Sequence, residues 1–308
     1  AKAETPNIDA LAKDGVLFTR AFCVVPACNP SRAALMSGLR PETTGQYTNA
    51  GNFRDKPGGQ AIITLPQYLR AHGYEAVAAG KIFHHQRGVG EEPRPLSDPV
   101  SWNRQRKGPI GTPEKGIYMD DYNKAAWLQG DWRKYVPDPT MNSGMSYMTR
   151  AGVWGPIDYE KKECGDWQTA EYCADYLQQE HDKPFFLACG IFRPHSPQLA
   201  PKEYFDRYPL ESVTVPQVPG DDMEDVPEIA KTNWSTPFVH LVREKGQWKQ
   251  AVQGYLASMS FADDCVGHVL NALENSSYRD NTLVVLWTDH GWQLGHKDRW
   301  EKFSLWHQ

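Results

Sequence analysis

Three short apolar runs, separated by helical patterns, are the feature that most constrains the fold of this 308-residue chain. Residues 75–79, 184–191 and 282–288 have the length of strands and are almost continuously apolar, which is typical of strands buried on both faces of a sheet. A helical pattern at 166–179 lies between the first and second runs, and another at 249–273 lies between the second and third. The alternation predicts an α/β fold: a doubly wound, mostly parallel sheet with helices on both faces.

Shorter elements are predicted elsewhere along the chain. A helix with an early proline runs over 5–15 and leads into a short strand at 16–18. Further helices are expected at 30–36 and 64–73, each followed or ended by glycine. The segment 88–165 is rich in Pro, Gly and Trp and shows no lasting periodicity. We interpret it as a long insertion over the core and not as a separate domain.

Residues 28–32 read Cys-Asn-Pro-Ser-Arg and continue to Leu35, Met36, Ser37 and Gly38. From average composition, the spacing Cys-x-Pro-Ser-Arg is expected by chance in roughly one chain in a thousand of this length. A buried free cysteine before a proline-started helix is the structural alternative.

Chemically useful side chains follow each of the three apolar runs. Lys81, His195 and Asp289 come within a few residues of the predicted strand ends, and Cys28 comes just before a helix. Because ligands bind at the carboxyl ends of strands in such sheets, we expect these side chains to converge at one edge. Asp289 and His290 together have the chemistry of a metal half-site, although a turn capped by Asp289 is the alternative.

These segments resemble a known family. Residues 28–38 match the Cys-x-Pro-Ser-Arg-x-x-Leu-x-(Ser/Thr)-Gly signature of the type I, formylglycine-dependent sulfatases, and the Asp-His-Gly at 289–291 is similar to the metal motif of the alkaline phosphatase superfamily. The Gly-Lys-x-Phe-His at 80–84 and the Pro-His segment at 193–197 resemble the iduronate-2-sulfatase-like subgroup, as does the stretch 295–306. The resemblance therefore covers nearly the whole chain.

The resemblance implies sulfate ester hydrolysis, with Cys28 oxidised to formylglycine before folding. One hydroxyl of the hydrated aldehyde would attack sulfur, and the second would let sulfate leave without attack by water. Arg32 would hold this diol and screen charge, while Lys81 and Lys302 would bind the sulfate oxygens. The start of the helix after Pro30 would add backbone N–H groups and a favourable dipole.

Two histidines and a metal complete the implied site. His195 would donate a proton to the departing alcohol, and His84 would help to remove a proton from the second hydroxyl. One calcium ion would be held by Asp289, His290 and the converted Cys28. A nitrogen ligand is unusual for this hard cation, and most sulfatases have Asn where the iduronate-like subgroup has His.

The chain also departs from the family pattern. Sulfatases normally begin with an apolar strand ending in two adjacent aspartates that bind the metal, and a smaller C-terminal subdomain follows the catalytic domain. The acidic pairs at 120–121, 221–222 and 263–264 do not follow apolar strands and are more typical of turns or a helix face. We therefore expect 1–308 to be a single but incomplete catalytic domain, with 88–165 as its insertion, and expect it to bind calcium weakly.

The insertion supplies candidate contacts to a sugar. Aromatic faces suit sugar rings and guanidinium groups suit carboxylate or sulfate, but the tryptophans could equally pin an irregular segment to the core. The residues concerned are Trp102, Trp127, Trp132, Trp154 and Trp167, with Arg104, Arg106, Lys107 and Arg133 among them. The family resemblance favours a sulfated sugar unit of a polysaccharide or glycosaminoglycan.

Other expectations concern partners and location. A net charge of -5 argues against nucleic acid, and no apolar run has the length of a membrane-spanning helix. The family implies a formylglycine-generating maturation enzyme and a secreted, periplasmic or lysosomal location, while the oligomeric state stays open. The alternative functions are a phosphatase or phosphonate monoester hydrolase of the same superfamily and a noncatalytic binder of sulfated glycans.

Overall fold

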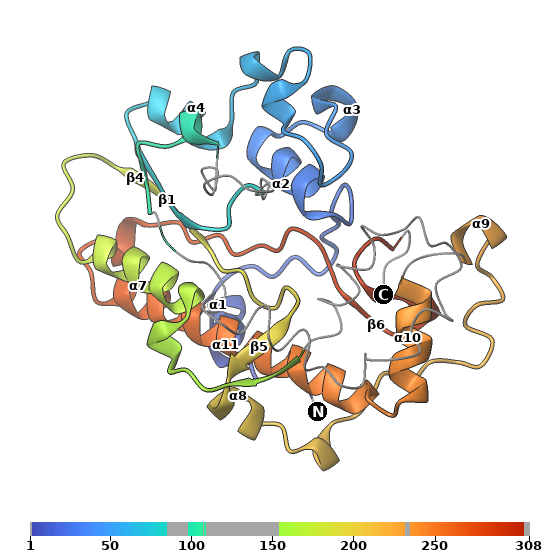
Figure 1. Ribbon diagram of the computed structural model, residues 1–308. Coiled ribbons are helices and arrows are strands. Elements are labelled where there is room, and N and C mark those ends of the chain that lie inside the picture. The colour runs from blue at the N-terminus through green and yellow to red at the C-terminus, as the bar shows by residue number, and fades with distance from the viewer. Residues whose placement is uncertain (1, 85–97, 107, 109–153, 232–234, 305–308) are drawn as a thin grey trace.

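A parallel three-stranded sheet lies at the centre of the computed structural model, which describes residues 2–84, 98–106, 108, 154–231 and 235–304 (Figure 1). The strands are β1 (Glu75–Gly80), β2 (Arg104–Gln105) and β4 (Phe185–Gly190), in the order β2-β1-β4. β1 and β4 are parallel along their whole length, from the Glu75–Phe185 pair to the Gly80–Gly190 pair. The predicted α/β class with a parallel sheet is confirmed, and the strands at 75–79 and 184–191 are present.

Helices cover both faces of this sheet (Figure 1). On one face, α2 (Cys28–Ser37) and α4 (Leu65–Ala71) lie near β1, and Ala33 packs with Ala76 and Ala78 in one apolar cluster. On the other face, α7 (Gly165–Leu177) packs against β1 and β4, and α11 (Trp248–Glu274) packs against α7. Small side chains in the strands let both helical layers come close to the sheet.

The strand ends are held tightly together beside α7. A Cβ atom at Gly80 would lie 2.1 Å from the carbonyl oxygen of Gly190 and 2.6 Å from Cγ2 of Thr169. Gly80 also has a φ of +73°, which side-chain-bearing residues rarely adopt. Glycine is therefore required where β1 turns toward Lys81.

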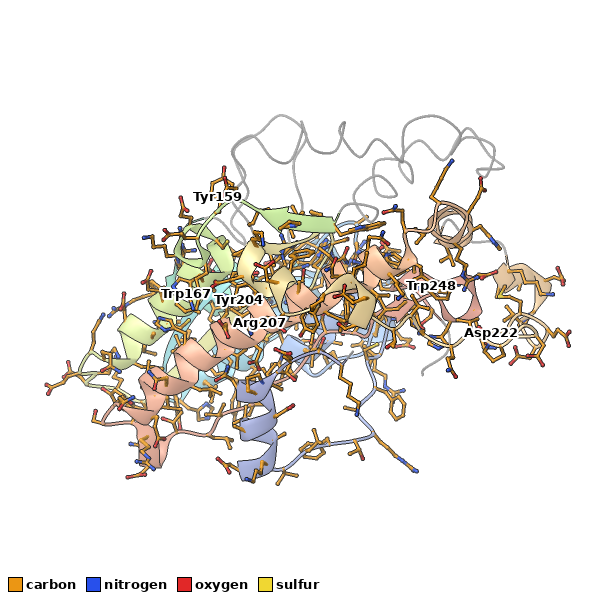
Figure 2. All side chains as sticks on the ribbon, turned by 90° about the horizontal axis from the view of Figure 1, so that it is seen from below. Tyr159, Trp167, Tyr204, Arg207, Asp222 and Trp248 are labelled. Carbon is orange, nitrogen blue, oxygen red and sulfur yellow. The ribbon has the colours of Figure 1, made fainter. Side chains whose placement is uncertain are left out.

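A second layer packs on α11. The parallel strands β3 (Trp154–Ile157) and β5 (Gln198–Pro201) lie against it with α8 (Lys202–Asp206). On α8, whose Tyr204 is labelled in Figure 2, the Tyr204 ring packs 5.2 Å from the Phe261 ring, and its hydroxyl donates a 2.7 Å hydrogen bond to Asp264. This layer anchors the loop that leads from β4 into β5.

The remaining elements are short. The helices are α1 (Pro6–Asp14), α3 (Pro41–Thr44), α9 (Glu228–Lys231) and α10 (Ser235–Glu244), and an antiparallel pair is formed by β6 (Gln293–Leu294) and β7 (Trp300–Glu301). Single 3-10 turns occur at Phe53–Asp55, Gly59–Ala61, Pro99–Ser101, Lys161–Glu163, Leu210–Ser212, Arg279–Asn281 and His296–Asp298. Among the described residues, none of the helices is both apolar enough and long enough to span a membrane.

Two predicted strands are wrong. Residues 16–18 and 282–288 are not strands, and the side chains of Val16 and Leu283 are 80% and 88% exposed. Along 283–287 every side chain is at least 37% exposed, and no described strand pairs with this segment. An apolar, β-branched segment only prefers the extended conformation. It becomes a strand when a neighbouring strand pairs with its backbone hydrogen-bonding groups.

Other expectations need adjustment. The helix expected at 30–36 begins two residues earlier, at Cys28. Within the segment 88–165, interpreted as an insertion over the core, β2 joins the central sheet and β3 pairs with β5. Residues 85–97, 107 and 109–153, with Trp127, Trp132, Lys107, Arg133 and the acidic pair at 120–121, lie outside the described residues.

The acidic pair at 263–264 is not simply solvated. Asp263 is 1% exposed and accepts hydrogen bonds from the backbone N–H groups of Asn7 (3.2 Å) and Ile8 (2.8 Å) at the start of α1. This carboxylate therefore ties α1 to α11 by filling the open donors of a helix N-terminus.

Candidate active site

The first turn of α2 places Cys28 inside the protein. Ala27 precedes the helix in an extended conformation, and Gly38 ends it with a left-handed φ of 69°. The N–H of Asn29 donates to Oδ1 of Asn49 at 2.9 Å, so one open donor of the helix start is already used by a neighbouring loop. Cys28 is 1% exposed, so its thiol faces other side chains and not solvent.

Three cationic or metal-binding side chains converge on the sulfur of Cys28. Sγ lies 3.3 Å from Nε2 of His290, 3.5 Å from Nζ of Lys302 and 3.7 Å from Nζ of Lys81. His84 and His195 also lie near Cys28 and influence the pKa of its thiol. We call these six residues the Cys28 cluster.

The members of the Cys28 cluster come from distant segments. Lys81 follows the end of β1, His195 follows the end of β4, and Lys302 follows β7. Nζ of Lys302 lies 3.1 Å from Nε2 of His195, so these two residues meet beside the sulfur. The carboxyl ends of the parallel strands thus supply the site, as this fold class predicts.

The cluster favours a negative charge at position 28. Burial by itself raises the pKa of the Cys28 thiol, but the Lys81 ammonium and the neighbouring His195, His290 and His84 side chains outweigh burial and hold the pKa far below its usual range. The sulfur stands where the oxygen atoms of a formylglycine would lie. The surroundings are therefore suited to an anion next to residue 28.

The pKa values of Lys81, His195 and His84 are lowered by burial and by neighbouring positive charges. Burial, with the charges of Arg32 and Lys302, lowers the pKa of Lys81 to about 8 against the attraction of the Cys28 thiolate. Burial and the charges of Lys302 and Lys81 hold the pKa of His195 well below its usual value, and burial is also the main cause that lowers the pKa of His84. Both histidines are therefore neutral near pH 7.

The pKa of Lys302 moves the other way. Burial lowers it, but the Glu301 carboxylate and the Cys28 thiolate outweigh burial and raise the pKa of Lys302 above its ordinary value. Lys302 is 2% exposed and its Nζ lies 3.5 Å from Oε1 of Glu301. It is therefore a permanently charged group inside the site.

A second group of contacts holds the candidate metal ligands. Nε of Arg32 forms a 2.8 Å ion pair with Oδ2 of Asp289, and the hydroxyl of Ser31 donates to the Asp289 carbonyl oxygen. Nη1 of Arg32 donates to the carbonyl oxygens of Lys81 (2.5 Å) and Ile82 (2.9 Å). Arg32 thus joins α2, the end of β1 and the segment after 288.

The ligand atoms of Cys28, Asp289 and His290 lie within 4.8 Å of one another. A carboxylate oxygen and a formylglycine oxygen are ligands that a hard cation prefers, and an imidazole nitrogen is also accepted by softer divalent ions. Nδ1 of His290 bonds the Gly291 carbonyl oxygen at 2.9 Å, which leaves Nε2, the nitrogen that faces Cys28, as the atom that would bind a cation. The donor set fits one divalent cation.

Asp166 positions the site but was not predicted to do so from the sequence. Asp166, at the start of α7, is fully buried and accepts hydrogen bonds from the backbone N–H groups of Phe192 (2.8 Å) and Arg193 (3.0 Å). Arg193 in turn donates to the His195 carbonyl oxygen at 2.8 Å. Together they clamp the loop that carries His195. An aspartate in the first turn of a predicted helix was the only sequence signal.

Glu301 was missed as well. It is 0% exposed, its Oε1 accepts a 3.3 Å hydrogen bond from Ser196, and the same oxygen pairs with Lys302. Glu301 therefore links the His195 loop to Lys302. No sequence pattern distinguished this glutamate from a solvated one.

Two of the candidate sugar contacts, Trp102 and Arg104, are already engaged within the protein. Trp102 is 5% exposed and packs with ring-centroid distances of 5.9 Å to Phe186 and 6.4 Å to Phe83, so it belongs to the core. Arg104 pairs with Glu75 at 2.7 Å. For Trp102 the sugar-binding interpretation is wrong, because its faces are covered by other aromatic rings.

Comparison with known proteins decides the family. The sulfatase family profile matches residues 1–308. The chain belongs to the sulfatase family. This sulfatase chain is 36% identical over 310 residues to a sulfatase of Formosa agariphila, a match that covers 98% of this chain and 57% of the relative. It is also 30% identical over 315 residues to human iduronate 2-sulfatase, covering 97% of this chain and 52% of that enzyme.

Solved structures show the same sulfatase fold. A phosphonate monoester hydrolase from Silicibacter pomeroyi superposes with a TM-score of 0.66 at 20% identity, covering 99% of this chain and 61% of that one. A 2-O GAG sulfatase superposes with a TM-score of 0.62 at 19% identity, covering 98% of this chain and 56% of that one. The chain spans about half the length of the curated relatives it matches.

Proposed function

We propose that the protein hydrolyses a sulfate ester on a sugar unit of a sulfated polysaccharide or glycosaminoglycan. The observation that carries this proposal is the position of Cys28, which lies in the sulfatase signature and within 3.7 Å of Lys81, Lys302 and His290. Two buried ammonium groups beside the nucleophile position suit the negative oxygens of a sulfate group. The iduronate 2-sulfatase relative and the GAG sulfatase neighbour favour a glycan substrate.

Residue 28 and a metal would supply the reactive chemistry. Formylglycine at position 28 would provide a hydrated aldehyde, one hydroxyl of which attacks sulfur while the other allows sulfate to leave. A divalent cation, expected to be calcium, would polarise the sulfate and lower the pKa of the attacking hydroxyl. Asp289, His290 and residue 28 would hold it, and Arg32 would keep Asp289 in place through their 2.8 Å ion pair.

The buried cations would bind and orient the sulfate group. Lys81 and Lys302 are 4% and 2% exposed, so their charges act where water screens them little. Arg32 would add a third positive charge next to the diol. Since each lysine reaches residue 28 from a different strand end, the oxygens would be held from two sides.

His195 is the proposed proton donor for the departing alcohol. Nδ1 lies 2.7 Å from the Ser196 carbonyl oxygen, so it carries the hydrogen, and Nε2 faces the Lys302 ammonium at 3.1 Å. The negative charge of a bound sulfate ester offsets the lysine charges and thereby favours a proton on Nε2. His84, neutral because its pKa is lowered, would accept the proton of the second hydroxyl.

Conversion of Cys28 requires a partner that acts early. In the folded chain Cys28 is 1% exposed, so a formylglycine-generating enzyme would have to oxidise it before folding buries it. A polysaccharide substrate places the mature protein outside the cytoplasm, in a secreted, periplasmic or lysosomal location. Both statements rest on the proposed activity.

A phosphatase or phosphonate monoester hydrolase activity is the second candidate. The fold match to the Silicibacter pomeroyi phosphonate monoester hydrolase, with a TM-score of 0.66, makes this activity the second candidate. Sulfate and phosphonate monoesters share tetrahedral geometry and negative oxygens, so the Cys28 cluster suits both. Their relative turnover therefore has to be measured.

The decisive experiment combines mass spectrometry with turnover. The chain is produced with a formylglycine-generating enzyme, and the tryptic peptide 21–32 is examined for loss of sulfur at Cys28. Rates with 4-nitrophenyl sulfate and 4-nitrophenyl phosphate are then compared, with Cys28→Ala as the matched control. An aldehyde with faster sulfate turnover supports the proposal. An unmodified thiol without turnover favours a noncatalytic glycan binder, and faster phosphate turnover favours the second candidate.

A further inference from the structure

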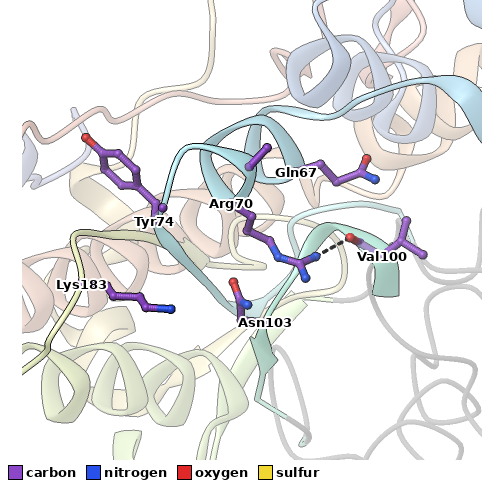
Figure 3. Close-up of a pocket in the computed structure, with 8 residues that line it drawn as sticks. Gln67, Arg70, Tyr74, Val100, Asn103 and Lys183 are labelled. Carbon is purple, nitrogen blue, oxygen red and sulfur yellow. Dashed lines mark hydrogen bonds between the residues drawn. The ribbon is translucent and has the colours of Figure 1, made fainter.

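A pocket of about 400 Å³ lies at the opposite end of the central sheet from the Cys28 cluster (Figure 3). Its lining comes from α4, the turn before β1, the segment before β2 and the turn before β4. The polar and aromatic lining residues are Gln67, Arg70, Tyr74, Asn103 and Lys183, with Val100 at one side. Lys81 follows the far end of β1, so six strand residues, about 20 Å, separate the two places.

The pocket is rich in positive charge and in hydrogen-bond donors. Arg70 uses Nη1 to donate to the Val100 carbonyl oxygen at 2.6 Å, and its Nε is buried without a partner among the described residues. Lys183 is exposed and forms no ion pair within the part of the chain that the structure describes. In Figure 3 Lys183 extends toward Asn103 and the Arg70 guanidinium turns toward Val100, and both cations line the same pocket.

An amide group adds a donor of fixed orientation. Oδ1 of Asn103 accepts the Ala76 N–H at 2.9 Å. Because a backbone donor fixes this oxygen, the –NH₂ group of Asn103 is left as a donor for another partner. The pocket lining contains no carboxylate, and the nearby Glu75 is already paired with Arg104 at 2.7 Å.

We propose that this pocket binds a sulfate-bearing sugar unit of the polymeric substrate, as a second site remote from the Cys28 cluster. A sulfate ester presents several acceptor oxygens around one negative charge, which matches the guanidinium, ammonium and amide donors. The ring of Tyr74, 38% exposed, offers a flat face against which a sugar ring can pack. This inference rests on the proposed function, because it takes the polymer from that proposal.

Binding to immobilised heparin tests the pocket without any need for turnover. Arg70→Gln/Lys183→Gln is expected to raise the Kd for heparin on the order of tenfold at 0.1 M salt, since two charge-assisted contacts are lost. The matched control, Lys13→Gln/Lys245→Gln, removes the same net charge from exposed sites and is expected to keep wild-type affinity. Lys183 is exposed, so Lys183→Gln alone is not expected to disturb folding. This single variant is expected to raise the Kd for heparin severalfold, which keeps the test valid if the double variant folds poorly.

Further arms separate the ligand classes. Desulfated heparin and a DNA duplex of matched charge are both expected to bind more weakly than heparin and to be insensitive to the Arg70 and Lys183 changes. Inorganic sulfate alone is expected to compete only weakly. The inference is overturned if the Arg70 and Lys183 changes weaken DNA binding as much as heparin binding. It is also overturned if free sulfate binds as tightly as heparin, or if the test and control variants have the same Kd for heparin.

Kinetics distinguishes this inference from the proposed function. The pocket variants are expected to raise KM for a sulfated oligosaccharide while leaving kcat and KM for 4-nitrophenyl sulfate unchanged. If 4-nitrophenyl sulfate is not turned over by the converted wild-type chain, the proposed function fails, whereas the heparin arm still reports on the pocket.

Discussion

Replacing Asp166 by Asn tests whether one buried carboxylate holds the His195 loop in place. Asp166 is 0% exposed, and its two oxygens accept hydrogen bonds of 2.8 and 3.0 Å from consecutive backbone N–H groups. Asn keeps one acceptor but turns an –NH₂ group toward the other N–H, leaving that donor unsatisfied. Such a buried, unpaired donor costs about 1–3 kcal/mol, and loss of the charge-assisted bond adds to it.

We therefore expect Asp166→Asn to lower the free energy of unfolding by about 2–4 kcal/mol, measured by urea denaturation. For a domain of this size each kcal/mol corresponds to about 2–4 °C in Tm. The released loop also carries His195, whose Nε2 lies 3.1 Å from Nζ of Lys302. A displacement on the order of 1 Å can cost about a hundredfold in rate, so kcat for 4-nitrophenyl sulfate should fall more than KM changes.

Asp263→Asn provides the matched control. Asp263 is 1% exposed and accepts hydrogen bonds from two consecutive backbone N–H groups, those of Asn7 and Ile8, but it holds α1 and not the His195 loop. It should lose similar stability and keep its kcat. The reasoning is refuted if Asp166→Asn keeps wild-type kcat below its unfolding range, or if both variants lose activity equally.

Three further results are expected. Cys28→Ala should abolish turnover of 4-nitrophenyl sulfate while heparin binding stays within about twofold, because the pocket of Arg70 needs no formylglycine. Because Lys81 has a pKa of about 8 and loses its charge above it, the inhibition constant of inorganic sulfate should rise above pH 8, on the order of tenfold per pH unit, and Lys81→Met should flatten this profile. Trp102→Ala should cost about 3–5 kcal/mol in urea denaturation without changing KM for a sulfated oligosaccharide, since the ring is core and not a sugar contact.

Much of the site could be located from the sequence because its chemistry is local. The Cys-x-Pro-Ser-Arg segment placed Cys28 at a helix start, and polar residues directly after apolar strands placed Lys81 and His195 at one sheet edge. Parallel strands bring their carboxyl ends together, so these positions were expected to meet. The distances from Sγ of Cys28 to the lysine Nζ atoms, 3.5 and 3.7 Å, agree with that expectation.

The sequence by itself determined the α/β class, the parallel sheet and the residues that converge on Cys28, because strand and helix periodicities and short motifs are written locally. Only the tertiary structure decided that residues 282–288 have no partner strand among the described residues, that Trp102 belongs to the core, and that Asp166 and Glu301 hold the segments that carry His195 and Lys302. Each of these depends on which groups from distant segments share a buried space. Hydrogen bonds and ion pairs between such groups have no periodicity that a single chain can display.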